Sequence, residues 1–250
     1  GGLLGYAAGG TISSSFATGA VTGSIHPFVG GFVGQNRATI RNSFTDSVVS
    51  STGEYVGGFV GLNAGGSITS TSTSGSVSGS GTSSNYVGGF VGRNDAAISD
   101  ATVLISTVDP ATGVGVYGRA LVGGFAGWSN GGSITNANVQ ASVEGTLTSV
   151  GGFVGQMSAG TTLSFNGAEG SVQAPTQVGG FAGYMNGGVI HSSFANTSVS
   201  ETSWTGAAGV GGFVGHFNNG SITASRAAGS VQGWGSVGGF VGLMSNSGSI

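Results

Sequence analysis

The sequence contains no cysteine and no lysine, and it has few charged residues of any kind. Its five basic residues are all arginine, and eight acidic residues bring the formal net charge to −3. Without cysteine there is no disulfide framework, thiolate zinc site, iron–sulfur cluster or thiol nucleophile. Scattered arginines do not form the basic surface that nucleic-acid binding requires. No run of 18 or more apolar residues is present, so the sequence predicts no transmembrane helix.

Glycine, in contrast, makes up 55 of the 250 residues, against a usual share of about 7%. The chain is not of the disordered type, because 38% of its residues are hydrophobic and 14 are phenylalanine. The glycines do not recur at every third position, which excludes collagen. Glycine also disfavours helix interiors by about 1 kcal/mol relative to alanine. The composition therefore predicts β-structure with many tight turns.

A five-residue block of the type GGFVG occurs nine times and defines an internal repeat. The blocks start at residues 1, 30, 57, 88, 123, 151, 179, 211 and 238, at steps of 27 to 35 residues. A second apolar anchor, such as Ile40 or Ile68, follows 10 to 12 residues after each start. A third anchor, such as Val49 or Val77, follows nine residues later in seven repeats, and the fourth repeat departs from this near Thr107 and Val108. One connection, after the third anchor, is expected to absorb the length variation.

This pattern predicts an all-β fold, a right-handed, three-sided parallel β-solenoid of about 8–9 coils, forming one continuous array over residues 1–250. Each repeat supplies three short strands with the sequence types VGGFVG, GSIT and GSV. Each strand is expected to pair in parallel with its equivalent one coil away, at about 4.8 Å. The handedness follows from the general preference of parallel crossover connections.

Period-two alternation assigns the faces of the first predicted strand. The position directly after the block is occupied by Arg93, Gln156 and His216 in different repeats, and such polar residues are rarely interior. This position shares a face with the valine that precedes the block's phenylalanine. The valine face is therefore expected outside and the phenylalanine face inside. The predicted core ladder is Phe32, Phe59, Phe90, Phe125, Phe153, Phe181, Phe213 and Phe240. The opposite face forms a predicted outer stripe of Val29, Val56, Val87, Val122, Val150, Val178, Val210 and Val237. An exposed apolar stripe of this length is a candidate interface. Either a second rod or the chain's own variable loops would cover it.

Asparagine recurs at the corner that follows the block. Asn36, Asn63 and Asn94 lie six residues after the block start, and Asn130, Asn186 and Asn218 lie seven after it. Asparagine suits tight corners, and stacked asparagine side chains can hydrogen-bond along an array. These residues are therefore interpreted as structural.

The repeats resemble the GLUG-motif repeats of bacterial surface and secreted proteins. The resemblance rests on residues 1–21, 57–77, 179–199 and 211–231 (for example GGFVGLNAGGSITSTSTSGSV), and it extends over essentially the whole chain, with phenylalanine where that family more often has leucine. It implies a segment of a large extracellular adhesin of the filamentous-haemagglutinin type, or the N-terminal region of an immunoglobulin-A-cleaving protease. No catalytic residue is implied, because the repeat carries none.

The residues that could carry chemistry are scattered among the repeats. His26, His191 and His216 occupy different repeat positions, so no catalytic, metal or cofactor site is predicted. Among the acids only Asp95 and Asp100 are close in sequence, whereas glycosidic cleavage needs a carboxylate pair. A carbohydrate-active β-helix and an ice-binding solenoid are weaker alternatives. Arg41 and His191 interrupt the threonine ladder that ice binding would need.

The insertion loops, at about residues 78–86, 109–121 and 200–209, are the predicted place for ligand contacts. Their candidate contact residues are Tyr55, Tyr86, Tyr117, Trp204 and Trp234. Exposed aromatic side chains stack on sugars or pack against protein partners. The expected ligand is therefore a glycan or protein of a host or another surface.

The predicted function is structural and non-enzymatic: a fibre-forming or adhesin-stalk solenoid, extracellular or on a bacterial cell surface. The chain begins and ends inside predicted strands without a polar cap, so we expect it to be part of a longer array that self-associates laterally or end to end. The alternative function is a spacer in a large secreted enzyme such as a protease.

Overall fold

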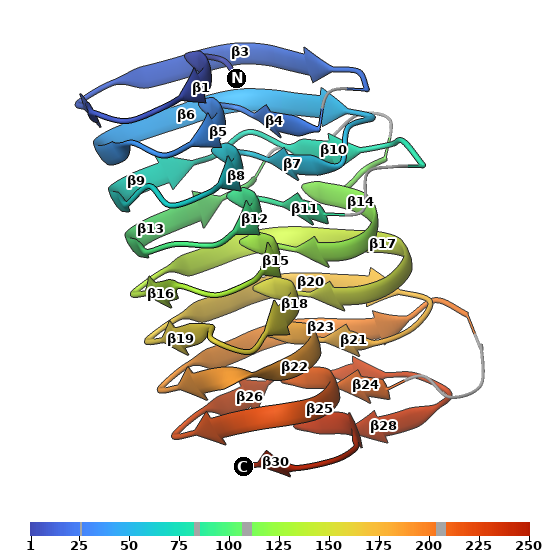
Figure 1. Cartoon of the computed structure of the whole chain (residues 1–250). Helices are drawn as coiled ribbons and strands as arrows, with labels where there is room; N and C mark the ends of the chain where they lie inside the picture. The colour runs from blue at the N-terminus through green and yellow to red at the C-terminus, as the bar shows by residue number, and fades with distance from the viewer. Residues whose placement is uncertain (26, 83–85, 107–111, 204–208) are drawn as a thin grey trace.

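The computed structural model describes residues 1–25, 27–82, 86–106, 112–203 and 209–250, and this part of the chain is all-β. Its thirty strands join in one sheet, pair in parallel, and stack as a solenoid of about eight turns (Figure 1). In Figure 1 the far strands run left to right and the near strands right to left as the chain descends, which is a right-handed winding. The described residues contain no helix, and so none that could cross a membrane. The predicted parallel β-solenoid is confirmed.

Each turn consists of four segments, because the first predicted strand is divided in two. First segments are β4 (Phe28–Gly30), β7 (Tyr55–Gly57), β11 (Tyr86–Gly88), β21 (Val178–Gly179), β24 (Gly209–Gly211) and β28 (Ser236–Gly238). Second segments are β1 (Leu4–Ala7), β5 (Val33–Asn36), β8 (Val60–Asn63), β12 (Val91–Asn94), β15 (Ala126–Ser129), β18 (Val154–Ser158) and β29 (Val241–Met244). Strands β22 (Ala182–His191) and β25 (Val214–Thr223) continue from the second segment into the third.

The third and fourth segments contain the second and third anchors of the repeat. Third segments are β2 (Thr11–Ser13), β16 (Ser133–Thr135), β19 (Thr162–Ser164) and β30 (Gly248–Ser249), and β6 (Thr39–Ser51), β9 (Ile68–Thr73) and β13 (Ile98–Leu104) continue into the fourth. Fourth segments are β3 (Phe16–Gly23), β10 (Val77–Gly79), β20 (Gly167–Ala174), β23 (Phe194–Glu201), β26 (Arg226–Ala228) and β27 (Val231–Gln232). Strands β14 (Val116–Gly123) and β17 (Asn138–Gly151) run on into the next first segment.

The predicted core phenylalanines form a single column inside the solenoid. Consecutive rings from Phe32 to Phe240 are stacked with centroids 4.7 to 4.9 Å apart. The rings are fully buried except Phe240, which is partly buried in the last turn. The glycines beside them allow the backbones to approach, since a Cβ added at Gly58 would collide with the carbonyl oxygen of Gly89.

The predicted outer stripe of valines is wrong. Val29, Val56, Val87, Val122, Val150, Val178 and Val210 are at most 5% exposed and belong to the same core as the phenylalanines, whereas Val237 in the last turn is 46% exposed. The strand breaks after the first glycine of the block, at Gly31 and Phe32 in this turn, so alternation does not continue from the valine to the phenylalanine and both side chains turn inward. The valines pack on glycines of the fourth segment: a Cβ at Gly118 would lie 2.8 Å from the side chains of Val87 and Val122. The chain's own interior therefore covers this column.

A second interior column changes from polar to apolar along the axis. Asn36 Nδ2 donates to Asn63 Oδ1 at 3.0 Å, and Asn63 Nδ2 donates to Asn94 Oδ1 at 2.9 Å, with all three residues fully buried. In the turns that follow, the same register position is occupied by Ser129, Met157, Met185 and Phe217. We call this set of residues, Asn36 to Phe217, the corner column.

A corner between the third and fourth segments has left-handed backbone without glycine. Its residues all have φ between 47° and 57°: Ser14, Asn42, Ser70, Asp100, Asn136, Phe165, Ser192 and Ala224. Asparagine, aspartate and serine tolerate this conformation better than phenylalanine or alanine. The sequence pattern predicted neither this corner conformation nor its position.

The fourth turn differs from its sequence interpretation. Val116, and not the region of Thr107 and Val108, is the third anchor, because it pairs with Val77 in one neighbouring turn and with Val143 in the other. The insertion in this turn therefore precedes the third anchor instead of following it. Thr107 and Val108 lie outside the described residues.

Candidate functional site

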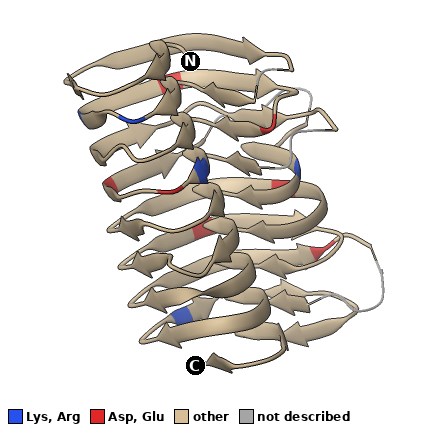
Figure 2. Cartoon of the chain, in the orientation of Figure 1, with Lys and Arg blue, Asp and Glu red and all other residues tan. Residues whose placement is uncertain are grey.

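Charged residues are spread along the solenoid and do not gather in one place (Figure 2). The described residues contain no group of three histidine, aspartate or glutamate side chains that could hold a metal ion. Asp95 pairs with Arg93 at 2.8 Å, and Asp100 accepts a hydrogen bond from Asn136 Nδ2 at 2.7 Å. The two acids that are close in sequence thus use their carboxylates in separate contacts on the surface. His26 lies outside the described residues.

An outer aromatic ladder follows the first segments and consists of Phe28, Tyr55, Tyr86 and Trp128. The first three rings are stacked on one another at 4.8 to 5.5 Å, and Tyr86 stacks on Trp128 at 5.4 Å. Two of the predicted contact residues, Tyr55 and Tyr86, are therefore half-buried in a ladder. Burial raises the pKa of both tyrosines above the ordinary value.

Arg93 on β12 packs against two rings of this ladder. Its guanidinium carbon lies 4.6 Å from the Trp128 ring centroid and 6.0 Å from that of Tyr55. Burial lowers the pKa of Arg93, but hydrogen bonds to Asp95 and Tyr55 outweigh this and raise it, so the cation is firmly held. Trp128 Nε1 donates to Ser158 Oγ at 2.9 Å. Because the ring faces are used by neighbouring rings and by Arg93, the ladder stabilises the stack and offers few free faces to a ligand.

The remaining predicted contact residues do not gather in one place. Tyr117 is half-buried on β14, and Trp234 is 58% exposed. The buried carboxylate of Glu201 accepts the backbone N–H of Trp234 at 2.7 Å and that of Gly235 at 3.3 Å, which fixes the loop that carries this tryptophan. Trp204 lies outside the described residues.

His216 belongs to a polar network on the outer face of the second segments. Its Nε2 lies 2.8 Å from Ser245 Oγ, and its Nδ1 lies 3.2 Å from Gln177 Nε2. A glutamine N–H can only donate, so Nδ1 accepts and the ring is neutral with its proton on Nε2. Burial lowers the pKa of His216, in agreement with a neutral ring. Ser245 Oγ in turn donates to Asn218 Oδ1 at 3.1 Å.

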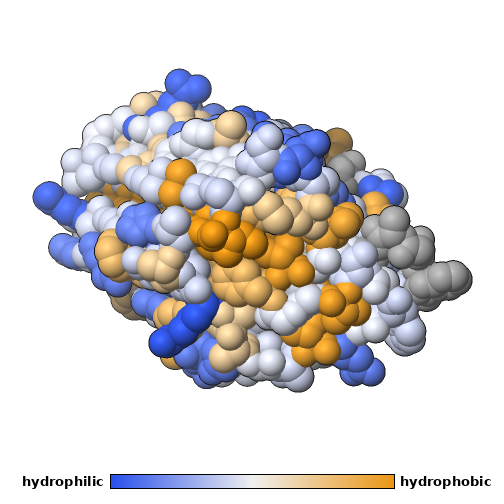
Figure 3. Space-filling model, turned by 90° about the horizontal axis from the view of Figure 1, so that it is seen from below, coloured by the Kyte–Doolittle hydropathy of each residue, from blue (hydrophilic) through white to orange (hydrophobic). Residues whose placement is uncertain are grey.

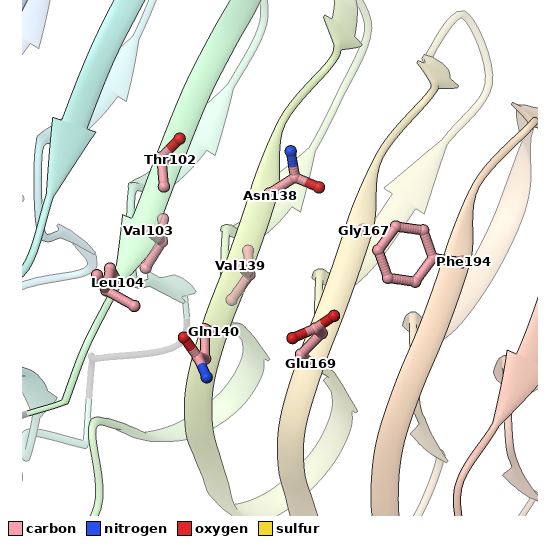
Figure 4. Close-up of a pocket in the computed structure, with 9 residues that line it drawn as sticks. All are labelled: Thr102, Val103, Leu104, Asn138, Val139, Gln140, Gly167, Glu169 and Phe194. Carbon is pink, nitrogen blue, oxygen red and sulfur yellow. The ribbon is translucent and has the colours of Figure 1, made fainter.

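A shallow groove lies on the outer face of the fourth segments, and the sequence interpretation missed it. It has a volume of about 240 Å³ and crosses β13, β17, β20 and β23 (Figure 4). The lining residues are Thr102, Val103, Leu104, Asn138, Val139, Gln140, Gly167, Glu169 and Phe194. The hollow exists because Gly167 has no side chain between Asn138 and Phe194, its register partners in adjacent turns. A glycine at an outward strand position was the available sequence signal.

The site and fold define a repeat β-solenoid whose ordered side-chain ladders run along its axis. Compared with known protein families, curated proteins and solved structures, the chain shows no match.

Proposed function

We propose that this chain is a structural, non-enzymatic solenoid that serves as the stalk or fibre-forming part of an extracellular adhesin. The observation that carries the proposal is the unbroken column of eight phenylalanine rings from Phe32 to Phe240. A column of this kind holds successive turns in one register and makes the chain a rod. At about 4.8 Å per turn, about eight turns span roughly 40 Å.

Two further observations support a scaffold role. The described histidines and the acids Asp95 and Asp100 make local contacts and do not converge on one cavity. The outer aromatic ladder and the buried asparagines connect successive turns in the N-terminal half of the solenoid, and contacts between neighbouring turns are what a repeat protein needs for stability. The GLUG-like repeats favour the surface of a bacterium as the location.

Immunogold electron microscopy of intact cells of the source organism tests the location. We expect antibodies against this chain to label the cell surface or fibres that extend from it. Labelling confined to the cytoplasm of sectioned cells would overturn the proposal.

Force spectroscopy of the isolated chain tests the stalk role. Because each turn contacts only its neighbours, we expect unfolding under load in steps of one or a few repeats, each of about 30 residues. A single all-or-none event at low force would contradict the role of a stalk built from separate turns.

A further inference from the structure

The outer face of the fourth segments presents an aromatic ring in a different way from the outer aromatic ladder. Phe194 on β23 lies over Gly167 on β20, and a Cβ added at Gly167 would collide with the end of this ring. Figure 4 shows the ring broadside above Gly167. One face therefore rests on glycine backbone, and no other aromatic ring stacks on Phe194 within the described part of the chain.

Hydrogen-bonding groups surround this ring on neighbouring turns. The carboxylate of Glu169 and the amides of Asn138 and Gln140 line the same groove and form no hydrogen bond with any described residue. A second hollow of about 490 Å³ adjoins the first, shares Glu169 and Phe194 with it, and adds Arg226. The guanidinium of Arg226 lies over the Phe194 ring, with its carbon 5.4 Å from the ring centroid. Unlike Arg93, Arg226 is exposed and forms no ion pair with a described residue, so its side chain is free to leave that face. The groove thus runs along the solenoid axis past an aromatic surface.

We propose that this groove binds a neutral oligosaccharide, with one sugar ring stacked on Phe194 in place of the exposed Arg226 guanidinium. A flat aromatic face attracts the weakly positive C–H groups of a sugar, and amide and carboxylate groups bond its hydroxyls. One carboxylate and one guanidinium flank the ring, so the groove has no excess charge for an anionic ligand. This site is independent of the stalk role, since a glycan could bind whether or not the chain forms fibres.

An extended peptide fits the groove less well. Peptides that bind to sheets add a strand at an open edge. Strands β17, β20 and β23 are instead paired on both sides by neighbouring turns. A ligand here must bind through side chains, and side chains with free amide and carboxylate groups suit hydroxyls.

Titration calorimetry with the full 250-residue chain tests the proposal. The probes are hexasaccharides of glucose, mannose, galactose and N-acetylglucosamine. We expect at least one to bind, and Phe194→Ala to weaken that binding about 3- to 10-fold through loss of the stacking surface. Glu169→Gln should weaken it through loss of the charged acceptor. Gly167→Ala should also weaken it, since the added methyl group displaces the ring while Phe194 is retained.

Phe44→Ala is the matched control. Phe44 lies in the same outward row of the fourth segments and is 47% exposed, but its ring stacks on Phe16 at 5.4 Å and does not line the groove. It should leave binding unchanged, and circular dichroism should show all four variants folded. The proposal fails if no probe binds, if Phe194→Ala binds as tightly as the unmodified chain, or if Phe44→Ala weakens binding equally. Selection of peptides that require Phe194, without any sugar binding, would assign the groove to a protein ligand.

Discussion

Replacing Asn63 by alanine tests whether the buried asparagines stabilise the solenoid. The change removes two hydrogen bonds, from Asn36 Nδ2 and to Asn94 Oδ1, in a fully buried place. Asn36 Nδ2 keeps its bond to the Ala38 carbonyl, but Asn94 Oδ1 loses the one hydrogen bond described for it. A buried polar group without a partner costs about 1–3 kcal/mol, and the vacated space adds to this. We expect a loss of about 2–4 kcal/mol in the free energy of unfolding.

Asn218→Ala provides a control of the same chemistry on the surface. Asn218 Nδ2 donates to Asn186 Oδ1 at 2.8 Å, and its Oδ1 accepts from Ser245 Oγ at 3.1 Å and from Asn246 Nδ2 at 2.6 Å, but these bonds lie at the surface. Water replaces the lost partners there, so we expect a change of at most about 0.5 kcal/mol. Urea denaturation followed by circular dichroism measures both variants, with the slope of the transition checked for a change. Equal losses in the two variants would refute the reasoning that burial decides the cost.

Three other predictions concern the backbone and pH. Ala224→Gly should raise the free energy of unfolding by about 0.5–1 kcal/mol, because it relieves a left-handed alanine, and a lower urea midpoint would contradict this. Gly58→Ala should lower it by about 1–3 kcal/mol, since the methyl group meets the backbone of Gly89; an unchanged melting temperature would show that the turns can separate. The lowered pKa of His216 means that the unfolded chain takes up the proton first, so its contribution to stability is present above about pH 6.5 and is lost as pH falls through the folded pKa. The melting temperature, measured from pH 4 to 8, should therefore decrease less on the acid side for His216→Gln than for the unmodified chain. The same pH dependence in both proteins would contradict the assignment.

The repeat spacing predicted the parts of the fold that depend on one residue type at one position. Phe59 and Phe90 recur with fixed neighbours, and a stacked column is the arrangement that buries them all. The valine column was assigned to the wrong face because alternation assumes a straight strand. The bend at Gly58 and Phe59, which separates β7 from β8, reverses that assignment.

The left-handed corner and the groove could not be predicted in the same way. Phe165 and Ala224 have no intrinsic preference for positive φ, and neighbouring turns impose it, for example where Phe165 N–H donates to the His191 carbonyl at 3.2 Å. The groove combines residues from successive turns, such as Asn138 and Phe194. Their proximity depends on the register between turns, and insertions of different length conceal that register in the sequence.

The change of the corner column from amide to thioether side chains makes the turns distinguishable during folding. A uniform stack would allow a turn to pair with the wrong neighbour at little cost, as identical strands do when they slip. Here a displaced pairing that set Asn63 against Met157, in place of Asn94, would leave a buried amide without its partner. The corner column thus specifies which turns pair with each other, much as one buried asparagine sets the alignment of a coiled coil.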